Sequence, residues 1–115
     1  MTSLFVYGTL MNRETQRRLL GRTLSGQPAI LTGYTLIRTP ANFGYYPIAV
    51  PRKNGTVAGL ILRGLTSQDL DILDEYEEVG HGPYQRIVVS AKLESGEFVT
   101  AFLYGMPGIK KPRSY

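Results

Sequence analysis

Short apolar runs separated by glycine, proline and asparagine make up most of the chain, and two stretches follow a helical period instead. The short runs predict six strands, at residues 3–7, 27–38, 47–51, 56–63, 84–93 and 97–104. The helical stretches predict a helix over residues 13–20, capped by Asn12 and ended by Gly21. A second helix is expected to begin at Thr66 or Ser67 and to end before residues 79–83.

Turn residues indicate how the strands connect. Lys53-Asn54-Gly55 predicts a hairpin between the strands at 47–51 and 56–63, and Glu94-Ser95-Gly96 predicts another between the last two strands. Gly33 predicts a bend inside the strand at 27–38. The expected fold class is therefore α+β, with mostly antiparallel strands whose sheet curls into a barrel.

The predicted second helix carries six of the nine acidic residues and no basic residue. On a helical wheel its apolar stripe consists of Leu70, Leu73 and Tyr76. Three acids fall on the opposite face, where water solvates them: Asp71, Glu75 and Glu78. Glu77 follows Leu73 by four positions and Leu70 by seven, so we expect it to point toward the core with the leucines.

An inward carboxylate costs several kcal/mol unless it is hydrogen-bonded, neutralised or facing a cavity. One interpretation of Glu77 is a side chain at a fraying helix end that reaches solvent near Val79. The other is a general base whose pKa is raised by burial and by the neighbouring acids Asp74 and Glu78. The wheel alone leaves both interpretations open.

Composition removes several classes of chemistry. The 115 residues are enough for one domain, and the chain has no cysteine and a single histidine, His81. A disulfide framework, a thiol nucleophile and the usual zinc or iron–sulfur sites are therefore excluded. His81 lies in a glycine-flanked loop, where we expect an exposed residue rather than a catalytic base.

The charge distribution is uneven. Outside the acidic helix there are 13 basic residues against three acidic ones, which favours either an anionic ligand or an ordinary solvated basic surface. We expect no nucleic-acid partner, because the strands present isoleucine, valine and leucine where interleaved basic and aromatic residues would be needed. Residues 1–11 have no basic lead, and their apolar run is too short for a signal peptide or a membrane span. A cytoplasmic protein with no membrane partner is expected.

The segment after the first strand is a second candidate site. Gly8-Thr9-Leu10 turns the chain between the first strand and the first helix, where free backbone N–H groups can bind a carboxylate or an oxyanion. Such turns also connect strands to helices in many folds, so the pattern alone does not assign a function.

Four segments together resemble the γ-glutamylcyclotransferase family, and most closely its small γ-glutamylamine cyclotransferase branch. In chain order they are Phe5 to Leu10, Leu73 to Glu77, Tyr84 to Arg86 and Ala101 to Gly105. The resemblance implies a small mixed, mostly antiparallel β-barrel with two flanking helices. It places the single domain at residues 1–105, followed by an extended or mobile tail at residues 106–115.

The resemblance also implies roles for individual residues. Glu77 matches the family's general acid/base, the last acid of an Asp-x-x-Glu motif. The substrate-binding residues implied are Tyr7, Gly8, Thr9, Leu10, Tyr84 and Tyr104. Without the resemblance, core packing is the favoured interpretation of the two later tyrosines, and an ion pair with the acidic helix explains Arg86. One departure is Glu78, where the family has glycine; this change bears on the pocket rim and on substrate choice.

The implied reaction is intramolecular. The α-amine of a γ-glutamyl amine attacks its own γ-carbonyl, which releases an amine and leaves 5-oxoproline, and no metal or cofactor is required. The partner expected is thus a small γ-glutamyl substrate. The competing hypothesis is a non-catalytic module that binds γ-glutamyl-like ligands on the same fold. Neither the amine that leaves nor the oligomeric state follows from the sequence.

Overall fold

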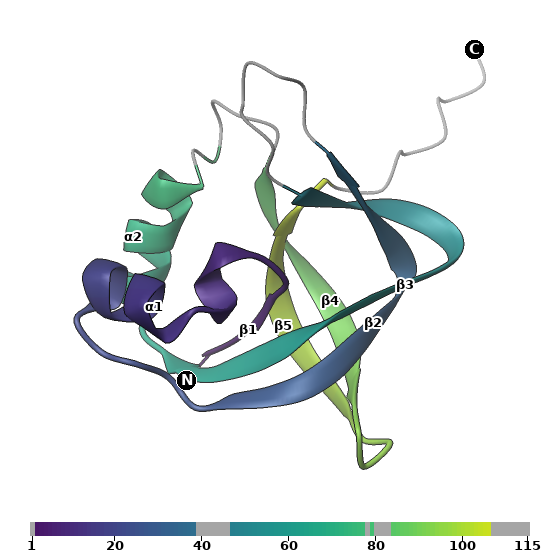
Figure 1. Ribbon diagram of the computed structural model, residues 1–115, viewed down its shortest axis with the longest axis horizontal. Helices are drawn as coiled ribbons and strands as arrows, with labels where there is room; N and C mark the ends of the chain where they lie inside the picture. Colours follow the sequence, from purple (N-terminus) through teal and green to yellow (C-terminus); the bar gives the residue numbers. More distant parts are fainter. Residues whose placement is uncertain (1, 39–46, 78, 80–83, 107–115) are drawn as a thin grey trace.

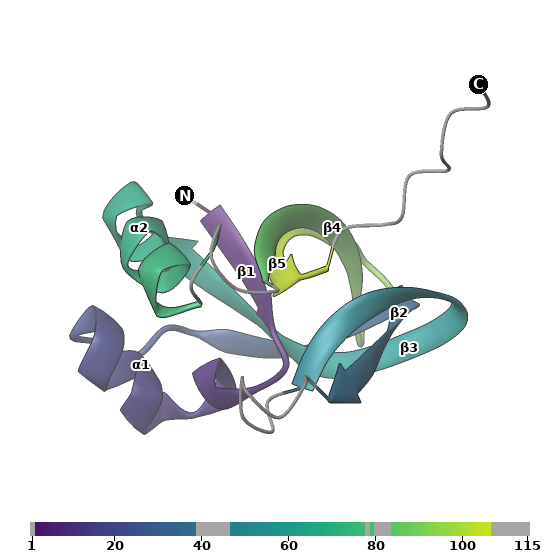
Figure 2. The ribbon, with the colours of Figure 1, turned by 90° about the horizontal axis from the view of Figure 1, so that it is seen from above.

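The computed structural model describes residues 2–38, 47–77, 79 and 84–106. Its elements are β1 (Thr2–Val6), the 3-10 helix η1 (Thr9–Met11), α1 (Arg13–Leu20), β2 (Gly26–Arg38), β3 (Pro47–Leu65), α2 (Ser67–Tyr76), β4 (Gln85–Leu93) and β5 (Phe98–Gly105). The strands form a closed barrel in the order β1-β3-β2-β4-β5, and both helices lie on the same side of it (Figures 1 and 2).

The barrel is mixed. β5 pairs in parallel with β1 and with β3, whereas the β1–β3, β2–β3, β2–β4 and β4–β5 pairs are antiparallel. The expected fold class, a mixed and mostly antiparallel barrel with two flanking helices, is confirmed. The predicted turn at residues 94–96 is also confirmed, with Gly96 at φ 92° and its N–H bonded to the carbonyl of Leu93 at 2.9 Å.

The predicted hairpin at residues 53–55 is wrong. Residues 47–51 and 56–63 do not pair with each other; both belong to β3, and both pair with β2. Four residues of β3, 52–55, stand opposite the single Gly33 of β2, so this is a large bulge where the paired strands bend (Figure 1). Asn54 has φ 64°, and the left-handed conformation that an Asn-Gly sequence permits serves this bulge as well as a hairpin turn.

Two hydrophobic clusters explain why the consecutive residues Leu4 to Val6 of β1 are all apolar. Phe5 packs inside the barrel, in a cluster that includes Leu31, Ile61 and Leu103. The neighbouring side chains of β1 point the other way, into a cluster shared with the helices: Leu4 and Val6 pack with Leu10, Leu62, Leu70 and Leu73. β1 is thus buried on both faces, as its continuous hydrophobicity predicts.

The helices begin and end where their local sequence predicts. The Asn12 side chain accepts hydrogen bonds from the N–H groups of Glu14 and Thr15, and Gly21 ends α1 at φ 75°. α2 begins with a capping box between Thr66 and Asp69. No helix within the described residues is long and apolar enough to cross a membrane.

The face of α2 that packs on the barrel differs in part from the predicted one. Leu70 and Leu73 are buried, with 8% and 1% of their surface exposed, but Tyr76 is 36% exposed and does not complete the apolar stripe. Its hydroxyl instead lies 3.0 Å from the side-chain oxygen of Thr9. The polar end of the ring therefore turns toward the segment that follows β1.

Candidate active site

The segment after β1 forms a short turn with free amides. Gly8 precedes η1, and its carbonyl accepts a 2.9 Å hydrogen bond from the N–H of Met11. Gly8 and Thr9 are exposed, whereas Leu10 is buried against the helices. Among the hydrogen bonds of the described residues, none is donated by the amide of Gly8, Thr9 or Leu10. The turn can therefore offer N–H groups to a ligand.

The C-terminal end of α2 lies beside this turn. The hydrogen bond between Tyr76 and Thr9 joins the two segments directly. Glu77 follows as the residue that caps α2, and its N–H donates a 2.8 Å bond to the carbonyl of Leu73. The backbone position of Glu77 is thus tied to the last turn of the helix.

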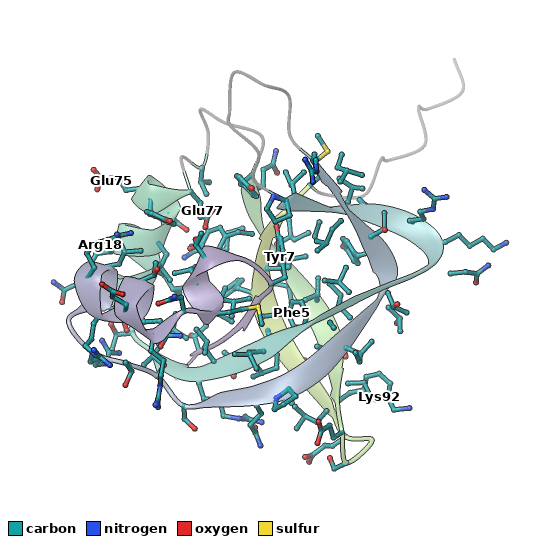
Figure 3. The ribbon with its side chains drawn as sticks, viewed as in Figure 1. Phe5, Tyr7, Arg18, Glu75, Glu77 and Lys92 are labelled. Carbon is teal, nitrogen blue, oxygen red and sulfur yellow. The ribbon has the colours of Figure 1, made fainter. Side chains whose placement is uncertain are left out.

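The Glu77 side chain points inward, as the wheel predicts. It is mostly buried, and this burial raises its pKa from the ordinary 4.5 to about 7. After burial and other causes, its charge contributes to raising the pKa values of both Tyr7 and Tyr104, so the carboxylate lies near these two side chains. Figure 3 shows Glu77 on the barrel side of α2, whereas Glu75 projects outward.

Tyr7 joins three strands through its hydroxyl. The hydroxyl donates a 2.5 Å hydrogen bond to the carbonyl of Tyr104 in β5 and accepts a 3.1 Å bond from the amide of Ala49 in β3. Burial raises the pKa of Tyr7 well above its usual value, so the ring stays neutral. These bonds hold the turn that begins at Gly8 against the barrel.

Tyr104 connects the barrel to α2. Its hydroxyl donates a 2.6 Å hydrogen bond to Oδ1 of Asp74 and lies 3.4 Å from the carbonyl oxygen of Leu70. Burial, followed by the hydrogen bond to Asp74, raises the pKa of Tyr104. Oδ2 of Asp74 lies 3.4 Å from Nη1 of Arg86, whose guanidinium stacks over the ring of Phe102. The expected pairing of Arg86 with the acidic helix is confirmed.

The third tyrosine of the predicted site, Tyr84, is half-buried just before β4. Its hydroxyl donates a 2.8 Å hydrogen bond to the carbonyl of Pro47 at the start of β3. The Tyr7 hydroxyl accepts from the amide of Ala49, two positions further along β3, so both hydroxyls bind the same end of that strand. Glu77, Tyr7, Tyr84 and Tyr104 therefore come together, from four separate parts of the chain.

Burial, rather than the neighbouring acid Asp74, accounts for the raised pKa of Glu77. Sequence reasoning named Asp74 only as that neighbour and did not place it in contact with Tyr104. The signal was available, because Asp74 follows Leu70 by four positions and so shares the inward face of α2. Several earlier expectations fall outside the described residues: the exposure of His81, the solvation of Glu78 and the tail after residue 106. Within the described residues, no group of three or more histidine, aspartate or glutamate side chains is arranged to hold a metal ion.

A family model described as gamma-glutamyl cyclotransferase, AIG2-like, matches residues 4–115. The chain belongs to this family. It is 37% identical over 90 residues to AIG2-like protein C of Arabidopsis thaliana, covering 78% of this chain and 49% of that protein. AIG2-like protein D of the same plant is 38% identical over 79 residues, covering 69% and 51%. The chain spans about half the length of these curated relatives.

Solved structures confirm the fold of this AIG2-like cyclotransferase family member. An Arabidopsis thaliana protein solved in solution superposes with a TM-score of 0.80 at 29% identity, covering 96% of this chain and 72% of that one. A structure named gamma-glutamyl cyclotransferase gives a TM-score of 0.77 at 21% identity, covering 93% and 67%. An AIG2-like protein of Mus musculus gives 0.69 at 21% identity, covering 97% and 80%. The barrel is thus of the cyclotransferase type.

Proposed function

We propose that this domain cyclises γ-glutamyl amines, releasing 5-oxoproline and a free amine, with Glu77 as the general acid/base. The observation that carries this proposal is the inward carboxylate of Glu77, which lies near Tyr7 and Tyr104 and has a pKa of about 7. Its position beside the turn after β1, joined by the Tyr76–Thr9 hydrogen bond, adds a second support.

The first step needs a base. The substrate's α-ammonium group must lose a proton before its nitrogen can attack the γ-carbonyl carbon. A carboxylate with a pKa near 7 is a much stronger base than an ordinary glutamate, and it is still about half ionised at neutral pH. Glu77 therefore accepts the ammonium proton, and the C–N bond that closes the five-membered ring forms.

The second step needs an acid. When the tetrahedral intermediate collapses, the bond between the former γ-carbonyl carbon and the leaving nitrogen breaks, and that nitrogen takes up a proton. Glu77 donates the proton it received in the first step to the leaving nitrogen. It then accepts the second proton that the ring nitrogen must lose to become the lactam N–H and passes this proton to the released amine, which leaves as an ammonium ion, so the reaction has no net proton change at the enzyme. The products are 5-oxoproline and the free amine.

The rest of the site orients the substrate and stabilises charge. The free amides of residues 8–10 can donate to the oxyanion that develops on the γ-carbonyl oxygen, and one such donor is worth about 3 kcal/mol. Holding the amine against the carbonyl in a reactive geometry contributes roughly 7–11 kcal/mol. Tyr7 and Tyr84 fix the strand ends around this space through their backbone hydrogen bonds.

The proposal is tested by incubating the protein with γ-glutamyl derivatives of amino acids, of the lysine side chain and of small polyamines, and by measuring 5-oxoproline. We expect turnover by the parent and a loss of about 100- to 10,000-fold in kcat for Glu77→Gln. Glu75→Gln is the matched control, since Glu75 lies on the exposed face of the same helix. Binding of these compounds without product would indicate a non-catalytic module instead.

A further inference from the structure

Asp74 and two side chains around it, Tyr104 and Arg86, form a connection that the proposed chemistry does not itself use. Asp74 accepts a 2.6 Å hydrogen bond from the Tyr104 hydroxyl and lies 3.4 Å from Nη1 of Arg86. Arg86 and Tyr104 are directly opposed in the β4–β5 ladder and so share a face of the barrel, and Tyr104 packs in the cluster that this face shares with the helices. Asp74 is thus the contact by which the last turn of α2 is anchored to two neighbouring strands.

Asp74 is also the residue whose position bears most directly on Glu77. The two residues are three positions apart, and side chains at this spacing are neighbours on a helix. Glu77 is the C-cap of α2, and helix ends fray unless contacts outside the helix hold them. The backbone bond from Val79 N–H to the carbonyl of Asp74, at 3.0 Å, adds a further link between this anchor and the chain that follows.

We propose that Asp74 is a positioning residue: anchored by Tyr104 and Arg86, it holds the last turn of α2 so that the Glu77 carboxylate stays turned toward Tyr7. Its importance for catalysis rests on the proposed function. The inference changes the expected role of Tyr104, whose hydroxyl serves the helix anchor rather than the substrate.

The consequence for Glu77 can be measured without activity. If the last turn of α2 loosens, the carboxylate becomes more solvated, and the burial that raises its pKa is reduced. The charged and titratable groups that face this region are Tyr7 on the β1 side, Tyr104 on β5, Arg86 on β4, and Asp74 on α2 itself. Tyr84 lies beside Tyr7.

The test is a carbon-13 NMR titration of the glutamate carboxyl groups, with Glu77 assigned from Glu77→Gln. In Tyr104→Phe, which removes only the hydroxyl, we expect the pKa of Glu77 to fall by about one unit or more. Asp74→Asn should lower it as well. Asp71→Asn is the matched control, because Asp71 is an exposed aspartate on the same helix, and it should leave the pKa unchanged.

Charge and position are separated by a double variant. Asp74→Asn alone removes a negative charge, which lowers the pKa of a nearby carboxyl even if nothing moves. Asp74→Asn combined with Arg86→Met removes the anchor with no change in net charge. This double variant replaces Tyr104→Phe in the titration if Tyr104→Phe does not fold. If Glu77 keeps its pKa in Tyr104→Phe and in the double variant, the positioning role is wrong.

Activity supplies the second measurement, with the best γ-glutamyl substrate of the panel. We expect kcat to fall about 10- to 100-fold in Tyr104→Phe and in Asp74→Asn, with KM changing less. The double variant of Tyr104→Phe and Asp74→Asn should lose little more kcat than either single variant. Unchanged kcat in both folded variants would overturn the inference while leaving the proposed function intact. A parent with no turnover whose Glu77 pKa still responds would reject the proposed function alone.

Discussion

The hydroxyl of Tyr7 donates a hydrogen bond to the carbonyl oxygen of Tyr104, 97 positions further along the chain. The same hydroxyl accepts from the amide of Ala49, so a single side chain joins β1, β3 and β5 where these strands end near the site. β1 is only five residues long, and it pairs with β5 at two positions. The Tyr7 hydroxyl therefore adds hydrogen bonds where β5 meets β1 and β3, which are two short backbone ladders of the barrel.

Replacing Tyr7 with phenylalanine tests these hydrogen bonds. The substitution leaves a largely buried carbonyl and amide without their partner, which costs about 1–3 kcal/mol. We expect the free energy of unfolding in urea to fall by this amount. Tyr34→Phe is a suitable control, because Tyr34 also packs partly buried against the barrel interior. Equal losses in the two variants would show that the Tyr7 hydrogen bonds contribute nothing specific.

Glu77 should cost the protein stability at neutral and higher pH. Burial raises its pKa from 4.5 to about 7 in the folded state, so the unfolded chain releases this proton at a lower pH than the folded protein does. Below pH 4.5 the carboxyl is neutral in both states and Glu77 does not lower the free energy of unfolding. The free energy of unfolding then falls as the pH rises to about 7.

Glu77→Gln should remove this dependence. At pH 8 the variant should be more stable than the parent by about 1–3 kcal/mol, and at pH 4 the two should be similar. Urea unfolding at the two pH values measures the difference. If the difference in stability between the variant and the parent is the same at both pH values, Glu77 is solvated, which contradicts its inward position.

The parts of the structure that could be predicted from sequence are those that short-range contacts decide. Asn12 and Gly21 bound α1, and Thr66 begins α2, because each acts on backbone groups within a few residues. The inward direction of Glu77 follows from its spacing to Leu70 and Leu73, although the same wheel is wrong for Tyr76, which is exposed.

The missed parts depend on residues far apart in the chain. Tyr104 and Asp74 are 30 positions apart, and no periodicity relates them. Whether an Asn-Gly pair reverses a strand or forms a bulge depends on the strand beside it, here β2 with its left-handed Gly33. Gly55 packs so closely on the carbonyl of Tyr34 that a side chain would collide with it, which local sequence cannot reveal.

Asp69 gives an acid-dependent prediction at the other end of α2. Its hydrogen bond with the Arg22 guanidinium holds the pKa of the carboxyl at about 2, and it also accepts the backbone N–H of Thr66. A depressed pKa contributes stability above the unfolded value of 3.8, and this stability is lost as the pH falls toward 2.

Asp69→Asn should therefore lower the free energy of unfolding at pH 7 by about 1–2 kcal/mol, since Arg22 is partly exposed and screened. The difference from the parent should shrink between pH 4 and pH 2. Circular dichroism during urea unfolding at several pH values measures this. A difference that stays constant down to pH 2 would rule out the ion pair as its source.

Gly8 allows the turn after β1 to be tested separately from the fold. An added Cβ has room at Gly8, because the nearest neighbouring heavy atom is Cγ of Pro47, at 4.0 Å. Gly8→Ala should therefore fold with a stability within about 1 kcal/mol of the parent.

If substrate lies against the amides of this turn, the methyl group restricts its approach, and we expect kcat/KM on the γ-glutamyl panel to fall at least about tenfold. Gly26→Ala, at the start of β2 and away from the site, is the matched control and should keep full activity. A fully active Gly8→Ala would show that the substrate does not approach this backbone closely, and the role of residues 8–10 in binding would have to be abandoned.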